Sequence, residues 1–89
     1  MKYVLFYDSA GAPAELIQQH AAAHRARWGE FQQAGSLLAI GPFTDGTGAM
    51  GVFSSREAAE EFAAGDPFVL HGVAGSWHVR EWMEAILSP

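Results

Sequence analysis

A histidine and an aspartate are the residues of this sequence best suited to acid/base chemistry. His24 lies in a segment with helical spacing of apolar residues, near the middle of the inward stripe, where an imidazole is costly to bury without a partner. Asp66 opens Asp66-Pro67-Phe68, a tripeptide typical of the start of a short helix. An imidazole takes and gives a proton near neutral pH, and a carboxylate hydrogen-bonded to one ring nitrogen fixes its tautomer. The two residues predict a proton-transfer site in which Asp66 orients and His24 carries the proton.

Each of these two residues also has a purely structural interpretation. A buried histidine can be satisfied by a backbone carbonyl or by water, and an aspartate before a proline is a standard helix N-cap. Capping and orienting are compatible because a carboxylate has two oxygens. The catalytic interpretation of His24 and Asp66 therefore depends on whether the two side chains meet, and the sequence does not name the reaction.

The remaining histidines predict neither a metal site nor a cofactor site. His20 and His24 have the i, i+4 spacing of some metal ligands, but a zinc site needs about three or four ligands. His71 and His78 would have to join them from distant segments, so a surface position for His20 is the preferred interpretation. His78 and Arg80 alternate with apolar residues, which places them on one sheet face, either between subunits or beside a cavity.

Charge and composition exclude several classes of function. Ten acidic residues against five basic ones give a net charge of −5, with no basic stripe to bind nucleic acid or an anionic membrane. The chain has no cysteine, which rules out disulfides, thiolate nucleophiles and cysteine-ligated metal centres. No apolar run has the length of a signal sequence or of a transmembrane helix. We therefore expect a cytoplasmic protein in which residues 1–89 form one domain.

Seven elements are expected in close succession. They are a strand at 3–8, a helix at 14–34, a strand at 36–40, a strand at 49–53, a helix from 55, a short helix from 67, and a strand from 75 to about 86. Pro13 suits the first helical position, and Gly35 suits the end of that helix. Ser54 and Glu57 have the spacing of a capping box for the second helix. The Arg80-Glu81 pair is expected to mark a bulge or the exit of the last strand, and a short helix is the alternative for its tail.

This order predicts a ferredoxin-like α+β fold, with a βαββαβ antiparallel sheet and helices on one face. Two helices cover only one face of a sheet. The first strand is nevertheless apolar or aromatic on both faces, with Tyr3, Leu5 and Tyr7 on one and Val4 and Phe6 on the other. We therefore expect a homodimer in which the second face packs against the same face of another subunit.

Four residues are expected to line a substrate pocket near His24. Gly41 and Pro42 end the second strand and would form a rigid floor, since proline fixes φ and glycine allows close approach. Phe43 and Phe68, each next to a proline, would contact a flat, apolar or aromatic molecule. The structural alternative is that the Gly-Pro pair simply ends a strand and that the aromatic rings fill the core.

Together these motifs give the sequence a resemblance to a known family. The residues that carry it are His24, Gly35, Leu37-Leu38, Gly41-Pro42, the strand at 49–53, the Ser-Arg-Glu-Ala helix start at Ser55, and Asp66-Pro67-Phe68. In order and spacing they resemble the YciI-like (YCII-related) family over nearly the whole chain. The resemblance implies a dimeric ferredoxin-like domain with a His–Asp active site at His24 and Asp66. The family is similar to small enzymes of aromatic degradation, including muconolactone isomerase and a hydrolytic dehydrochlorinase. The connection at residues 44–48 is short for the family, so this chain lacks the longer loop there.

Two classes of function remain open. The first is a cofactor-free lyase, isomerase or dehydrochlorinase-like enzyme acting on a small molecule, with His24 as general acid/base. The second is a non-catalytic module that binds a small ligand or serves interaction on the same dimeric scaffold. A third, less favoured possibility is a monooxygenase that acts without a cofactor, as in a related group of dimeric α+β barrels. Fold does not decide among them.

Overall fold

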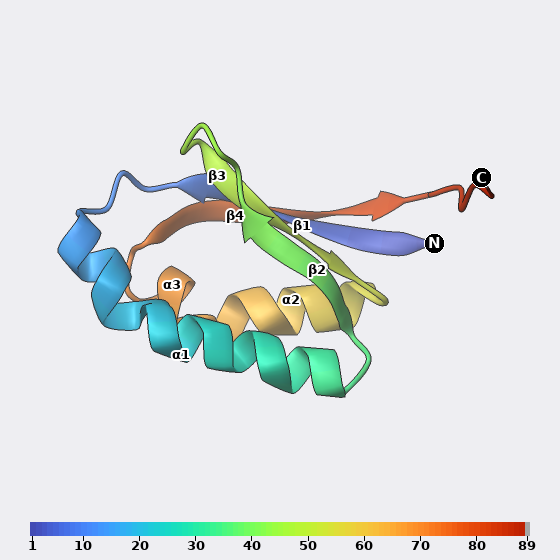
Figure 1. The fold of residues 1–89 in the computed structure, drawn as a ribbon, viewed down its shortest axis with the longest axis horizontal. Coiled ribbons are helices and arrows are strands. Elements are labelled where there is room, and N and C mark those ends of the chain that lie inside the picture. The colour runs from blue at the N-terminus through green and yellow to red at the C-terminus, as the bar shows by residue number, and fades with distance from the viewer. Residues whose placement is uncertain (89) are drawn as a thin grey trace.

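The computed structural model describes residues 1–88 and confirms the α+β, ferredoxin-like fold (Figure 1). A four-stranded antiparallel sheet has the strand order β2-β3-β1-β4. Its elements are β1 (Lys2–Ser9), α1 (Ala14–Gln33), β2 (Leu37–Pro42), β3 (Gly48–Phe53), α2 (Arg56–Gly65), α3 (Pro67–Leu70) and β4 (Ala74–Trp82). The helices lie together on one side of the sheet, and the N-terminus lies near the segment that follows β4 (Figure 1).

The central strand β1 places Tyr7 where the helices can reach it. β1 pairs with β3 on one side and with β4 on the other, with Tyr7 opposite Ala49 and Trp77. Alternation along a strand then directs Leu5 and Tyr7 to the helical side of the sheet, where both are buried. The pairing with β4 shifts between Tyr7 and Ser9, so the chain leaves regular register just after Tyr7.

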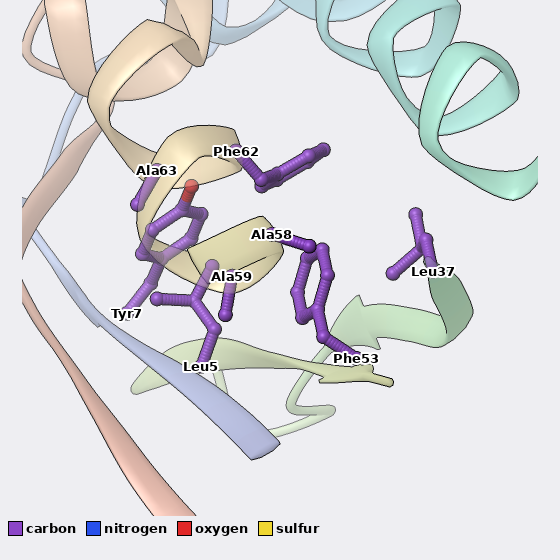
Figure 2. Close-up of a cluster of buried hydrophobic side chains, with 8 residues drawn as sticks. All are labelled: Leu5, Tyr7, Leu37, Phe53, Ala58, Ala59, Phe62 and Ala63. Carbon is purple, nitrogen blue, oxygen red and sulfur yellow. The ribbon is translucent and has the colours of Figure 1, made fainter. Parts of the chain in front are cut away.

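The core lies between this face of the sheet and α2. Small residues on α2 allow the helix to approach the sheet closely, and Phe62 and Phe53 fill the space between them with their ring centroids 5.3 Å apart (Figure 2). The buried cluster comprises Leu5, Tyr7, Leu37, Phe53, Ala58, Ala59, Phe62 and Ala63. The expectation that Ala58, Ala59, Phe62 and Ala63 face inward is confirmed.

Arg27 ties α1 to the C-terminal end of α2. Its guanidinium donates hydrogen bonds to the carbonyl oxygens of Phe62 at 3.1 Å and of Glu61 at 2.8 Å, near the C-terminal end of α2. The same side chain lies over the rings of Phe31 and Phe62. A Cβ on Gly65 would overlap this guanidinium, so Arg27 would have to shift if Gly65 were replaced. α1 is thereby fixed above the start of α3.

Several predicted boundaries differ from the structure. The N-cap of α2 is Ser55, whose hydroxyl accepts from Ala58 N, and not Ser54; the helix starts one residue later because this hydroxyl makes the capping bond. Pro13 is the N-cap of α1 rather than its first helical residue. β4 ends at Trp82, opposite Lys2 at the start of β1, because beyond that point there is no strand partner. Gly35 has φ 77° and ends α1 as predicted.

The sheet face opposite the helices bears both apolar and polar side chains. Phe6 stacks on His78 at 5.2 Å between centroids, which places His78 on this face, and Arg80 pairs with Val4 one step along the strands. Ser76 donates to Asp8 at 2.6 Å nearby. No helix among the described residues covers this face (Figure 1). No helix within residues 1–88 has the length and apolar character needed to cross a membrane.

Candidate active site

The side chains of His24 and Asp66 come together from distant parts of the chain. α1 carries His24 on its inward side, where only 8% of the residue is exposed. Asp66 lies between α2 and α3 and is completely buried. His24 Nδ1 and Asp66 Oδ1 are 2.6 Å apart, a distance typical of a strong hydrogen bond to a carboxylate. The condition set by the sequence, that the two side chains meet, is fulfilled.

Asp66 accepts two further hydrogen bonds that hold its carboxylate in place. Phe68 N donates to Oδ1 at 3.0 Å, which is the N-cap interaction predicted for α3. The Tyr7 hydroxyl donates to Oδ2 at 2.7 Å from the centre of the sheet. Three donors thus fix the position of one buried carboxylate, and no buried side-chain nitrogen or oxygen within residues 1–88 lacks a partner. Capping and orienting are carried out by the same group, as the two oxygens of a carboxylate permit.

The Tyr7 phenol acts only as a hydrogen-bond donor in this site. Burial raises the pKa of Tyr7 far above the usual tyrosine value, and the hydrogen bond and charge of Asp66 raise it further. The phenol is therefore protonated over the whole physiological range. Tyr7 was not predicted as a site residue, because nothing local in the sequence shows that a strand residue will reach a carboxylate 59 positions away.

Trp28 engages the second ring nitrogen of His24. Its indole Nε1–H lies 3.2 Å from His24 Nε2, one helical turn further along α1. An indole nitrogen only donates, so Nε2 carries the lone pair and the imidazole proton lies on Nδ1, directed at Asp66. The Phe68 ring stacks on the imidazole at 3.8 Å between centroids and fixes its plane. The imidazole is held in one tautomer and one orientation.

A cavity of about 340 Å³ lies beside the imidazole. Its walls are mostly apolar, with Asp8 and Arg25 as charged residues. His24 lines it whereas Asp66 does not, so a ligand would meet the histidine and not the carboxylate. The structure also brings to this cavity all the residues predicted to contact a substrate, namely Gly41, Pro42, Phe43 and Phe68.

The connection between β2 and β3 closes one side of the cavity. Phe43 N donates to the Gly48 carbonyl at 2.8 Å, and Gly46 N donates to the Phe43 carbonyl at 3.1 Å. Thr47 donates to Asp45 from both its hydroxyl and its amide, and these bonds lower the pKa of Asp45. A side chain on Gly48 would overlap the carbonyl oxygen of Tyr7, so glycine is needed where this connection returns to β1. The short connection is a structured turn.

The other histidines lie outside this site. His20 and His71 stack on each other with centroids 4.0 Å apart, and His78 lies on the open face of the sheet. Among residues 1–88, no three acidic or histidine side chains gather where they could hold a metal ion. The sequence did not single out Trp28 or Arg25 as site residues. Trp28 follows His24 at i+4 on the helix, and this spacing is the signal in the sequence that brings it near the imidazole.

The fold and the site define a small ferredoxin-like α+β protein with a buried His–Asp pair beside an apolar cavity. The YCII-related domain matches residues 1–83, and the chain belongs to that family. The fold is shared with a solved structure of 5-chloro-2-hydroxyhydroquinone dehydrochlorinase (TftG) from Burkholderia phenoliruptrix AC1100 in complex with 2,5-dihydroxybenzoquinone. The two chains have a TM-score of 0.72 and 20% sequence identity, and the alignment covers 96% of each. No curated protein matches the chain in sequence.

Proposed function

We propose that this chain is a single-domain enzyme of small molecules in which His24 is the general acid/base and Asp66 its orienting partner. The observation that carries the proposal is the 2.6 Å bond between Nδ1 and Oδ1 in a histidine that lines a cavity. It directs the Nδ1 proton at the carboxylate, so Nε2 is the nitrogen that would accept a proton from a ligand. The site residues, the absence of a cofactor requirement and the cytoplasmic location are parts of the same proposal.

The reaction supported best begins with removal of a proton from an activated carbon or hydroxyl. The proton moves to His24 Nε2, and Asp66 stabilises the resulting imidazolium through Nδ1–H. Returning the proton to another atom of the same substrate gives an isomerisation, and loss of a leaving group from the anion gives an elimination. A positioned acid/base contributes about 10²- to 10⁴-fold, which suits substrates whose proton is already acidic.

The cavity favours a planar ring that carries oxygen substituents. Its volume of about 340 Å³ is at the small end of ligand sites and suits one ring with its substituents. Phe43 and Phe68 would contact the faces of such a ring, and Gly41 and Pro42 would form the floor beneath it. The likeness in fold to a protein solved with 2,5-dihydroxybenzoquinone supports the same ligand class.

The working unit of the proposal is a homodimer formed through the open sheet faces. Trp82 is 49% exposed on that face and Phe6 is partly exposed, so both provide apolar surface there. A C2 pairing of two such faces buries this surface with the cavities on the outer, helical sides. Small-molecule ligands are the only other partners we propose.

The non-catalytic alternative has one observation in its favour. Trp28 occupies His24 Nε2, so in this conformation the lone pair of the base is already engaged. A binding module would keep this arrangement when a ligand enters the cavity, whereas an enzyme must release Nε2.

The test is a comparison of three proteins, the native chain, His24→Gln and His71→Gln. Each is incubated with small lactones, enolisable cyclic ketones and 5-chloro-2-hydroxyhydroquinone, and turnover is followed by absorbance and by chloride release. His71 is exposed and does not line the cavity, so its variant is the matched control. We expect turnover of at least one compound to be lost in His24→Gln and kept in His71→Gln. Binding of 2,5-dihydroxybenzoquinone without turnover of any compound would support the binding module instead.

A further inference from the structure

Trp28 has a contact with His24 that its position in the apolar stripe does not require. The indole lies one turn after His24 on α1, is half-buried and lines the cavity. Its ring meets the imidazole edge-on, with centroids 5.2 Å apart and planes at 76°. This geometry points the indole N–H at Nε2, at 3.2 Å. The second nitrogen of His24 is therefore filled by a side chain of the cavity wall.

Each neighbour of His24 has a separate role. Asp66, at the junction of α2 and α3, binds Nδ1, and Tyr7 from β1 acts through that carboxylate. Arg25 from α1 and Asp8 from β1 are the charged groups around the same cavity. Among the hydrogen bonds of residues 1–88, the one that reaches Nε2 comes from Trp28.

We propose that Trp28 is a positioning residue that holds His24 in the Nδ1–H tautomer and keeps Nε2 occupied until a ligand with an acidic proton replaces the indole. The inference rests on the proposed function, because an occupied lone pair matters only if Nε2 accepts a proton. While the indole N–H is bound, the Nε2 lone pair is not available to a second proton donor.

Loss of this hydrogen bond should make Nε2 more reactive by a predictable factor. A neutral hydrogen bond in a partly exposed position changes an equilibrium by about two- to tenfold. Trp28→Phe keeps an aromatic ring in the cavity wall and removes only the donor. Trp77→Phe is the matched control, since Trp77 is also half-buried and is absent from the cavity wall.

The experiment measures the rate at which diethyl pyrocarbonate modifies each histidine, resolved by peptide mass spectrometry. We expect the His24 rate to rise about two- to tenfold in Trp28→Phe and to stay at the native value in Trp77→Phe. His20, His71 and His78 are internal references whose rates should not change. A His24 rate in folded Trp28→Phe equal to the native rate overturns the proposal.

A second measurement on the native protein keeps the proposal testable if Trp28→Phe does not fold. Nitrogen-15 NMR should place the His24 proton on Nδ1 and detect a scalar coupling between the Trp28 indole N–H and His24 Nε2. A proton on Nε2 in the native protein overturns the proposal. Neither measurement depends on turnover. A negative result for Trp28 is therefore distinct from failure of the proposed function, which would be observed as the absence of proton transfer with every substrate tested.

Discussion

Replacement of Asp66 separates the stability of this site from its chemistry. Asp66→Ala removes the acceptor of three donors, namely the Tyr7 hydroxyl, Phe68 N and His24 Nδ1. Each buried donor left unpaired costs about 1 to 3 kcal/mol, so we expect a loss of about 4 kcal/mol in the free energy of unfolding. An 89-residue domain has about 4 to 13 kcal/mol in total. Asp66→Ala should therefore be barely folded.

Asp66→Asn should be much milder in stability. Its amide oxygen can still accept from His24 Nδ1–H and Phe68 N–H, and its amide nitrogen can donate to the Tyr7 oxygen. We expect a cost of about 1 to 2 kcal/mol, because the bonds lose the assistance of a charged acceptor. The variant keeps the imidazole in place but no longer stabilises an imidazolium, so turnover should fall although the protein remains folded.

The assay measures the effect of Asp66→Ala on urea unfolding in two backgrounds, the native protein and Tyr7→Phe. Unfolding is followed by tryptophan fluorescence at one fixed protein concentration. Tyr7→Phe removes one of the donors that Asp66→Ala would leave unpaired, so the two changes should be non-additive by about 1 to 2 kcal/mol. The reasoning would be refuted if Asp66→Ala cost less than about 1 kcal/mol, or if its cost were the same in both backgrounds. Either outcome would mean that the carboxylate does not hold the Tyr7 hydroxyl.

Three further predictions concern Tyr7, the turn at Gly48 and the open sheet face. Burial raises the pKa of Tyr7 above its ordinary value of 10.0, so this residue stabilises the fold below about pH 10 and the contribution is lost as pH rises further. The difference in phenolate absorbance at 295 nm between the native protein and Tyr7→Phe should show no ionisation of Tyr7 before alkaline unfolding. Gly48→Ala should cost about 1 to 3 kcal/mol in urea unfolding through overlap with the Tyr7 carbonyl, whereas Gly41→Ala, which has open space, should cost less than about 0.5 kcal/mol. Phe6→Glu should turn the proposed dimer into a monomer in light scattering with unchanged circular dichroism; a native monomer at micromolar concentration would refute the paired sheet faces.

The fold and the two central residues could be predicted because their signals are local. The spacing of apolar residues along α1 turns His24 inward, and an Asp-Pro pair after a glycine defines the N-cap at Asp66. The antiparallel order followed from the succession of strands and helices. Gly35 could be assigned because a helix end with positive φ favours glycine.

The remaining features depend on contacts between distant segments. Tyr7 reaches Asp66 only because β1 is the central strand and faces α2, which no property of residues 3–8 reveals. The role of Trp28 depends on the rotamer of one side chain, and the choice of Ser55 over Ser54 depends on one hydroxyl geometry. The end of β4 at Trp82 is set by where its partner β1 begins.

The central claim is that His24 transfers a proton to and from a ring compound in the cavity, and solvent deuterium exchange measures this step directly. Enolisable cyclic compounds, including 5-chloro-2-hydroxyhydroquinone, are incubated in D₂O with native protein, His24→Gln or Asp66→Asn, and loss of the carbon-bound proton is followed by NMR. We predict exchange above the buffer rate with native protein, a decrease of about 10²- to 10⁴-fold in His24→Gln, and an intermediate rate in Asp66→Asn. Exchange by folded His24→Gln at the native rate would contradict the account.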